Sequence, residues 1–200
     1  GASRTDSGVH ALGNVAVFDT EHRMPGEKVC FALNQRLPAD IRIQSSCEVP
    51  DGWHPRRCPC VKTYEYRILN RGVELPQRRL YPAFCRFPAD VERMRRGAAF
   101  LVGEHDFKSF CNVRTQAEST VRRVYDIQVE RDAGDVITIR IRGNGFLYNM
   151  VRIIAGTLLK TGMGQMEPEA VRTALEARDR QAAGPTAPAR GLTLVGIEYL

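Results

Sequence analysis

The sequence predicts an α+β fold, in which strands and helices follow one another in mixed order and neighbouring strands run antiparallel. Residues 123–129 and 136–142 read as an antiparallel pair joined by the polar turn Asp132–Asp135. Apolar residues recur at helical spacing within 90–102, 146–162 and 168–178. A hydrophobic content of 43% supplies enough apolar material for a core and excludes a disordered chain.

The first quarter of the chain predicts short elements. Residues 15–18 read as a buried strand, residues 25–34 as a helix opened by Pro25, and residues 41–45 as a second strand. Residues 50–60 contain three prolines and a glycine, which forbid a regular element. We therefore predict a subdomain over 1–52, a linker over 53–61 and a second subdomain over 62–200.

The second subdomain opens with an alternating strand over 62–69, which places Tyr64, Tyr66 and Ile68 on one face. Asp90 is placed to cap a helix that runs to Val102. A further helix has Phe146, Met150, Ile153, Ile154 and Leu158 on its apolar face and ends near Gly162. A helix over 168–178, a loop over 185–190 and a strand over 192–199 complete the chain.

Composition limits the classes of function. No apolar run is long enough to span a membrane, and the first residues do not resemble a signal peptide, so we expect a cytoplasmic protein. The six cysteines include one C-x-C pair, Cys58 and Cys60, and no set that completes four zinc ligands. We therefore expect no metal site and reduced, mostly buried thiols.

The net charge is +6, and all but four of the 29 basic residues are arginine. Arginine grips phosphate with a planar fork of donors, so this excess suits a polyanionic partner. An arginine-rich composition with no special partner explains the charge equally well. The basic residues Arg56, Arg57 and Lys62, and the pairs Arg78-Arg79, Arg95-Arg96 and Arg122-Arg123, are the candidates for phosphate contact.

The segment Arg4-Thr5-Asp6-Ser7-Gly8 has the composition of a loop with local side-chain hydrogen bonds. A carboxylate beside Arg4 stays ionised at neutral pH, and such a group can act as a nucleophile, a general base or a metal ligand. Generic chemistry also allows an Asx-turn that only stabilises the loop, and this interpretation is the simpler one for the five residues alone.

The longer string from Gly1 to Ala16 closely resembles the aspartate motif of the TruA-type tRNA pseudouridine synthases, written G-R-T-D-x-G-V-H-A. The chain departs from the motif at Ser3, where the family has glycine. Asp6 matches the family's catalytic aspartate, and Arg4 matches an arginine implicated in opening the stem and holding the flipped base. Further matches run along the chain: Asn34 to Ile41, Trp53-His54-Pro55-Arg56, Lys62-x-Tyr64-x-Tyr66, Gly103 to Phe110, Ser119 to Arg122, and Asn144 to Arg152.

The resemblance implies two ferredoxin-like subdomains that form a mixed, mainly antiparallel central sheet flanked by helices. It implies conversion of uridine to pseudouridine in the anticodon arm of tRNA, at positions 38–40, without metal or organic cofactor. Asp6 would be the nucleophile, at either C1′ or C6, Arg152 would pair with it, and Tyr64 would stack on the flipped base. The implied substrate-binding residues are Arg4, Thr5, His10, Arg56 and Lys62.

The resemblance also implies a homodimer with tRNA spanning both subunits. The family carries a strand and a helix before the aspartate motif, so we expect this chain to be an N-terminally truncated member. The residues by themselves allow blander interpretations, in which Arg152 extends to solvent from the margin of an apolar helix face and Tyr64 is a core residue. Two other classes of function are a catalytically silent tRNA-binding protein and an aspartate-dependent hydrolase.

Overall fold

The computed structural model describes residues 1–200, which divide into two compact units. One unit comprises Gly1–Ala2 and Val15–Cys58, and the other comprises Ser3–Asn14 and Pro59–Leu200. The boundary between the two units at Cys58 and Pro59 falls within 53–61, the predicted linker. The segment Ser3–Asn14, which contains Asp6, belongs to the larger unit. The division of 1–52 and 62–200 into subdomains stays a prediction.

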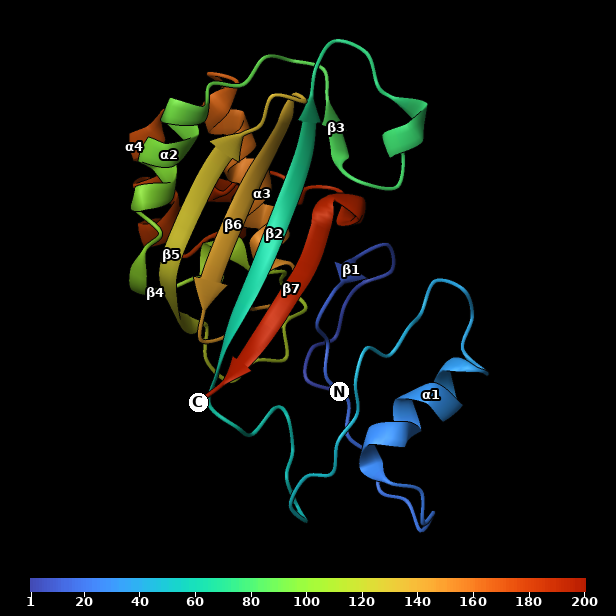
Figure 1. The fold of residues 1–200 in the computed structure, drawn as a ribbon. Helices are drawn as coiled ribbons and strands as arrows, with labels where there is room; N and C mark the ends of the chain where they lie inside the picture. Colours follow the sequence, from blue (N-terminus) through green and yellow to red (C-terminus); the bar gives the residue numbers. More distant parts are fainter. The chain divides into compact units, whose positions relative to one another are not determined.

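The elements of the larger unit form a seven-stranded mixed sheet and three helices (Figure 1). The strands are β1 (His10–Ala11), β2 (Cys60–Asn70), β3 (Ala83–Cys85), β4 (Gly103–Asp106), β5 (Val121–Arg131), β6 (Val136–Gly143) and β7 (Leu192–Tyr199). The helices are α2 (Val91–Ala99), α3 (Met150–Gly162) and α4 (Pro168–Ala177), with short 3₁₀ turns at Pro76–Arg78, Lys108–Phe110, Arg180–Ala182 and Ala189–Gly191.

The sheet order is β1-β7-β2-β6-β5-β4, with β3 beside the end of β2. β2 lies between β6 and β7 and runs antiparallel to both, and β5 is antiparallel to β6 and β4. The parallel pairings are β1 with β7 and β3 with β2. Apart from α4, which follows α3, the long elements have the chain order β2, α2, β5, β6, α3, β7, and their strands lie side by side as β7-β2-β6-β5.

Helices α2, α3 and α4 gather on one face of the sheet (Figure 1). Tyr64, Tyr66 and Ile68 of β2 belong to the core, together with fully buried isoleucines on β6 and α3. Alternation along β6 puts Thr138, Arg140 and Arg142 on the opposite face, where Arg140 pairs with Glu65 at 2.9 Å and Arg142 with Glu198 at 3.4 Å. The sheet therefore has one apolar face and one polar face.

Most sequence-based predictions for this unit are confirmed. The strands expected at 62–69, 123–129, 136–142 and 192–199 correspond to β2, β5, β6 and β7. Asp90 caps α2, accepting hydrogen bonds from the N–H groups of Glu92 and Arg93, although the helix ends at Ala99 rather than Val102. The mainly antiparallel α+β arrangement is as expected. Strands β1, β3 and β4 were not predicted because each has at most four residues.

The smaller unit contains one helix, α1 (Val29–Asn34), preceded by a 3₁₀ turn at Gly26–Lys28, as the sequence predicts. The prediction of strands at 15–18 and 41–45 is wrong, because neither segment pairs with a neighbouring strand. The Asn34 side chain instead bonds both the N–H and the C=O of Ile43 at 2.8 Å. In this part of the chain, hydrogen bonds to a side chain of the helix take the place of the backbone hydrogen bonds between two strands.

Candidate active site

The segment Ser3–Asn14 forms a closed loop that carries Asp6. The Asn14 side chain clamps its base, accepting from the Ser3 N–H at 3.3 Å and donating to the Ser3 C=O at 3.1 Å. A turn follows Asp6, whose C=O accepts from the Val9 N–H at 3.0 Å, and Gly8 takes a positive φ of 82° there. His10–Ala11 then pairs with β7, so both ends of the loop are held.

Asp6 and Arg152 form an ion pair although 146 residues separate them in sequence, with Arg152 Nη1 2.9 Å from Asp6 Oδ2. The Asp6 side chain is 33% exposed and that of Arg152 is 17% exposed. The alternative interpretation, in which Arg152 extends to solvent from its helix face, does not match this geometry. The carboxylate keeps an open side for a substrate, while the arginine is largely withdrawn from water.

Arg152 donates two further hydrogen bonds besides the one to Asp6. Its Nε donates to the Ala187 C=O at 2.8 Å, and Nη1 also donates to Asn149 Oδ1 at 3.1 Å. Asn149 precedes α3 in a left-handed conformation with φ of 61°, which asparagine tolerates better than most residues. These contacts fix the guanidinium, and through it the direction of the Asp6 carboxylate.

The segment 183–188 supplies the Ala187 carbonyl by crossing α3 at very short range. A Cβ added to Gly156 would lie 2.0 Å from the Pro185 carbonyl oxygen, and one added to Gly184 would lie 2.6 Å from Thr157 Cα. Thr157 Oγ1 accepts from the Gly184 N–H at 2.8 Å. Two glycines therefore let backbone meet backbone at this crossing, which positions the carbonyl that holds Arg152.

Tyr64 lies on β2 with 8% of its surface exposed. Its ring meets that of Phe146 edge to face, with centroids 5.1 Å apart. Burial raises the pKa of the Tyr64 hydroxyl, and a hydrogen bond with the Ser3 side chain offsets part of that rise. Ser3 Oγ also accepts from Lys62 Nζ at 2.9 Å, so Ser3 joins the aspartate loop to two residues of one β2 face.

Tyr66, expected to be a core residue, is 1% exposed. Its hydroxyl donates to the Pro188 C=O at 2.8 Å, which ties the core to the segment that holds Arg152. Burial raises its pKa, and the positive charges of Arg152 and Arg190 counteract this only in part. A Cβ on Gly191 would come within 2.7 Å of the Tyr66 ring, so glycine permits this approach.

The remaining predicted substrate residues are not all brought together. Arg4 and Thr5 are exposed beside Asp6 on the loop. His10 contacts the Leu80 C=O through Nε2 at 3.2 Å and packs on the Tyr81 ring, with centroids 3.9 Å apart. Arg56 is exposed in the smaller unit, so its role as a substrate residue stays a prediction.

Several of the predicted phosphate-binding arginines are engaged within the protein. Arg95 donates to the Val129 C=O at 2.7 Å and pairs with Glu92. Arg122 donates to the Ser119 and Val121 carbonyls at 2.9 and 2.6 Å, and burial lowers its pKa. Arg78 and Arg79, in contrast, are exposed. Arg78-Arg79 is therefore a better candidate for phosphate contact than Arg95 or Arg122.

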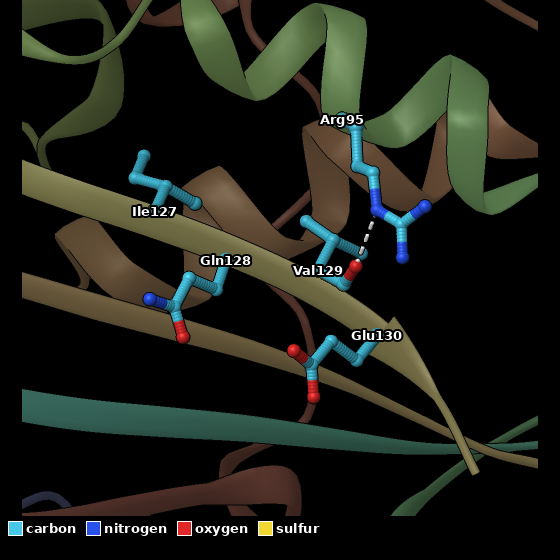
Figure 2. Close-up of a pocket in the computed structure, with 5 residues that line it drawn as sticks. All are labelled: Arg95, Ile127, Gln128, Val129 and Glu130. Carbon is cyan, nitrogen blue, oxygen red and sulfur yellow. Dashed lines mark hydrogen bonds between the residues drawn. The ribbon is translucent and has the colours of Figure 1, made fainter.

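A hollow of about 330 Å³ lies between α2 and the edge of β5 (Figure 2). Figure 2 shows Arg95 reaching from α2 to the Val129 carbonyl, with Gln128 and Glu130 on the same strand. Arg95, one of the predicted phosphate-contact residues, lines it, but none of the predicted catalytic residues does. The hollow holds no activated nucleophile, so the Asp6 loop remains the candidate active site.

Other expectations concern metal, thiols and membranes. No group of three or more histidine, cysteine, aspartate or glutamate residues lies where it could hold a metal ion. The six cysteines are unpaired, and only Cys30, Cys85 and Cys111 are buried, fewer than expected. Burial raises the pKa of the Cys111 thiol. None of the helices has the length and apolar character needed to cross a membrane.

Sequence reasoning did not assign several residues that build this site. Ser3 was noted only as a departure from a motif, and Asn14 and Asn149 only as members of matching strings. Ala187 takes part through its backbone carbonyl, so its side chain gave no indication of this role. A pair of glycines at 156 and 184 was the one available sign of a close backbone crossing.

The larger unit contains a partly open carboxylate paired with a fixed arginine, and Ser3 of the same loop lies beside a buried tyrosine. An ionised carboxylate can attack an electrophilic carbon, the arginine stabilises its charge, and an aromatic ring can stack on a planar base. These features define a candidate enzyme of the carboxylate-nucleophile class.

Comparison with known proteins agrees with this class. The family model described as tRNA pseudouridine synthase matches residues 1–56 and 98–200. The tRNA pseudouridine synthase A of Brevibacillus brevis is 48% identical over 199 residues, which span 100% of this chain and 81% of the relative. The protein of the same name from Bacillus subtilis is 43% identical over 198 residues, spanning 99% of this chain and 80% of the relative. The chain therefore belongs to the tRNA pseudouridine synthase family and is an isomerase.

Proposed function

We propose that this protein isomerises uridine to pseudouridine in the anticodon arm of tRNA, with Asp6 as the nucleophile. The observation that carries the proposal is the Asp6–Arg152 pair, in which a fixed guanidinium holds a carboxylate that remains one-third exposed. The hydrogen-bonded ion pair fixes the direction in which the carboxylate points. Family membership supplies the tRNA substrate and the reaction class.

The reaction breaks the C1′–N1 bond of uridine and joins C1′ to C5 of the same base. The proton on C5 is lost, and N1 gains one, so the product is an isomer of the substrate. Asp6 forms a transient covalent bond to the nucleoside, and attack at C1′ and attack at C6 both fit this balance. Tyr64 stacks on the base and assists the removal of the C5 proton.

The target base is stacked in its RNA helix and has to be flipped out to reach Asp6. Arg4 and Thr5, exposed next to Asp6, would hold the opened RNA strand. His10 lies on the same loop, and Lys62 lies on β2 and donates to Ser3 of that loop. Arg56 adds a further phosphate contact. We propose positions 38–40 as the target, by resemblance to the family.

Three broader proposals accompany this function. Apart from the additional helix α4, the long elements have the order β-α-β-β-α-β, with strands side by side as β7-β2-β6-β5, which supports a ferredoxin-like subdomain over residues 62–200. By resemblance to the family we propose a homodimer that binds tRNA across both copies. A cytoplasmic location fits a tRNA-modifying enzyme.

Release of tritium from tRNA labelled at C5 of uridine tests the reaction directly. We expect the protein to release tritium into water in proportion to pseudouridine formed, because the C5 hydrogen has to leave. A catalytically silent tRNA-binding protein would retain the tRNA without release. Binding without any release would contradict the proposal.

Replacing Arg152 by lysine tests the positioning of Asp6. Lysine keeps the charge but cannot reach the Asp6, Asn149 and Ala187 oxygens together, so the carboxylate loses its fixed aim. We expect the single-turnover rate to fall about 100-fold, the scale of a 1 Å misplacement. Tritium release under saturating enzyme measures that rate, with Arg71→Lys at an exposed position as the matched control. An unchanged rate in Arg152→Lys would show that Arg152 does not position Asp6 for the reaction.

A further inference from the structure

Ser3 stands where the family's aspartate motif has glycine, and its hydroxyl lies between two functional side chains. Lys62 Nζ donates to Ser3 Oγ at 2.9 Å, and the same serine side chain lies close enough to the Tyr64 hydroxyl to lower its pKa through hydrogen bonding. Lys62 and Tyr64 are two residues apart on β2, so alternation points both side chains to one face of the strand. The three polar groups therefore form a chain that ends at the proposed base-stacking tyrosine.

The donors and acceptors give this chain a direction. An ammonium group has three donors and no acceptor, so Ser3 Oγ accepts from Lys62. The single O–H of Ser3 is then free to donate to the Tyr64 oxygen. Hydrogen bonds that run in one direction polarise and strengthen one another, most of all where a charged donor begins the chain. Tyr64 consequently accepts from Ser3 and can direct its own O–H elsewhere.

The backbone holds Ser3 in place for this role. The Asn14 side chain bonds both the N–H and the C=O of Ser3, which leaves the residue little freedom to rotate away. Asp6 is three residues further along the same loop. A residue without a hydroxyl at position 3 would keep the loop clamp, because the clamp uses only backbone atoms, but would leave Lys62 and Tyr64 without a bridge.

We propose that Ser3 is a positioning residue of the reaction, which links Lys62 to Tyr64 and orients the tyrosine hydroxyl toward the bound base. The inference rests on the proposed function, because Tyr64 is the group through which Ser3 acts. It adds a residue that the motif itself does not provide, since glycine at this position has no side chain to form the link.

The test compares Ser3→Gly, Ser3→Ala and Ser3→Thr with Ser7→Ala, an exposed serine of the same loop. We expect Ser3→Gly and Ser3→Ala to lower the single-turnover rate about tenfold with the dissociation constant for tRNA unchanged, because the chain orients a group and does not bind RNA. Ser3→Thr retains a hydroxyl and restores most of the rate, and Ser7→Ala matches the wild type. Equal rates in Ser3→Ala and the wild type, or a loss confined to tRNA binding, would overturn the inference.

A double-substitution cycle with Lys62→Met locates the effect. If Ser3 transmits the influence of Lys62, the double variant is no slower than Lys62→Met alone, whereas independent roles multiply the two losses and contradict the inference. A readout without tRNA separates this inference from the proposed function. In protein labelled with ¹³C at tyrosine Cζ, the Tyr64 resonance, assigned with Tyr64→Phe, shifts in Ser3→Ala and not in Ser7→Ala. An inactive wild type refutes the proposed function, while an unmoved Tyr64 resonance refutes the role of Ser3.

Discussion

We expect Asp6→Asn to abolish pseudouridine formation and to leave the fold intact. Asparagine has nearly the same shape as aspartate and can still accept a hydrogen bond from Arg152, but its amide is not a nucleophile. We expect the single-turnover rate to fall about 10⁴-fold or more, the scale of losing an essential member of a catalytic set. Tritium release over hours under saturating enzyme measures so slow a rate.

The matched control is Asp19→Asn, an exposed aspartate that the site does not use. We expect it to retain the wild-type rate. Both variants should melt within roughly 4 °C of the wild type, because a partly exposed ion pair contributes only about 1 kcal/mol. A folded Asp6→Asn protein with more than about one-tenth of the wild-type rate would show that Asp6 is not the nucleophile.

Gly156→Ala is the substitution with the largest expected effect on the fold around the site. The added Cβ would lie 2.0 Å from the Pro185 carbonyl oxygen, and both atoms belong to or adjoin backbone that cannot swing away. Overpacking of this kind costs about 3 kcal/mol, even though alanine favours helices by about 1 kcal/mol over glycine. We expect a melting temperature lower by roughly 6–12 °C.

The same substitution also lowers activity in the molecules that remain folded. The segment displaced by the new Cβ carries the Ala187 carbonyl that receives Arg152 Nε, so Arg152 and Asp6 lose their alignment. Gly196→Ala serves as the control, because a Cβ there meets nothing within 4 Å. A Gly156→Ala protein as stable and active as Gly196→Ala would contradict the described crossing of α3 by residues 183–188.

The regular part of the fold could be predicted because its elements are long and strongly patterned. Ile137, Ile139 and Ile141 alternate with polar residues, and Asp90 stands directly before an amphipathic segment, so β6 and α2 needed no tertiary information. Residues 41–45 also alternate, with Ile41 and Ile43 on one side, but a strand requires a partner. The hydrogen bonds of Ile43 go to the Asn34 side chain, a choice that local sequence does not encode.

The residues of the candidate site also fall into a group that the sequence predicts and a group that it does not. Asp6, Tyr64 and Arg152 could be named because a long motif and two shorter ones mark them. The contacts that hold Arg152 could not, because Ala187 contributes a main-chain oxygen and any residue has one. Ser3 looked like a simple departure from the motif, and only the fold brings it to Lys62 and Tyr64, which lie about sixty residues away. Contacts that depend on the position of the backbone, rather than on the type of side chain, could not be predicted from the sequence.

Base-resolved chemical mapping of pseudouridine tests the central claim most directly. An unmodified tRNA transcript with uridines at positions 38–40 is incubated with the wild type, Asp6→Asn and Asp19→Asn, and every uridine of the transcript is read. We predict pseudouridine within 38–40 for the wild type and Asp19→Asn, and none for Asp6→Asn. Pseudouridine in the Asp6→Asn sample at the wild-type level, or none in any sample despite folded protein and bound tRNA, would contradict the assignment of Asp6 as the nucleophile of a tRNA uridine isomerase.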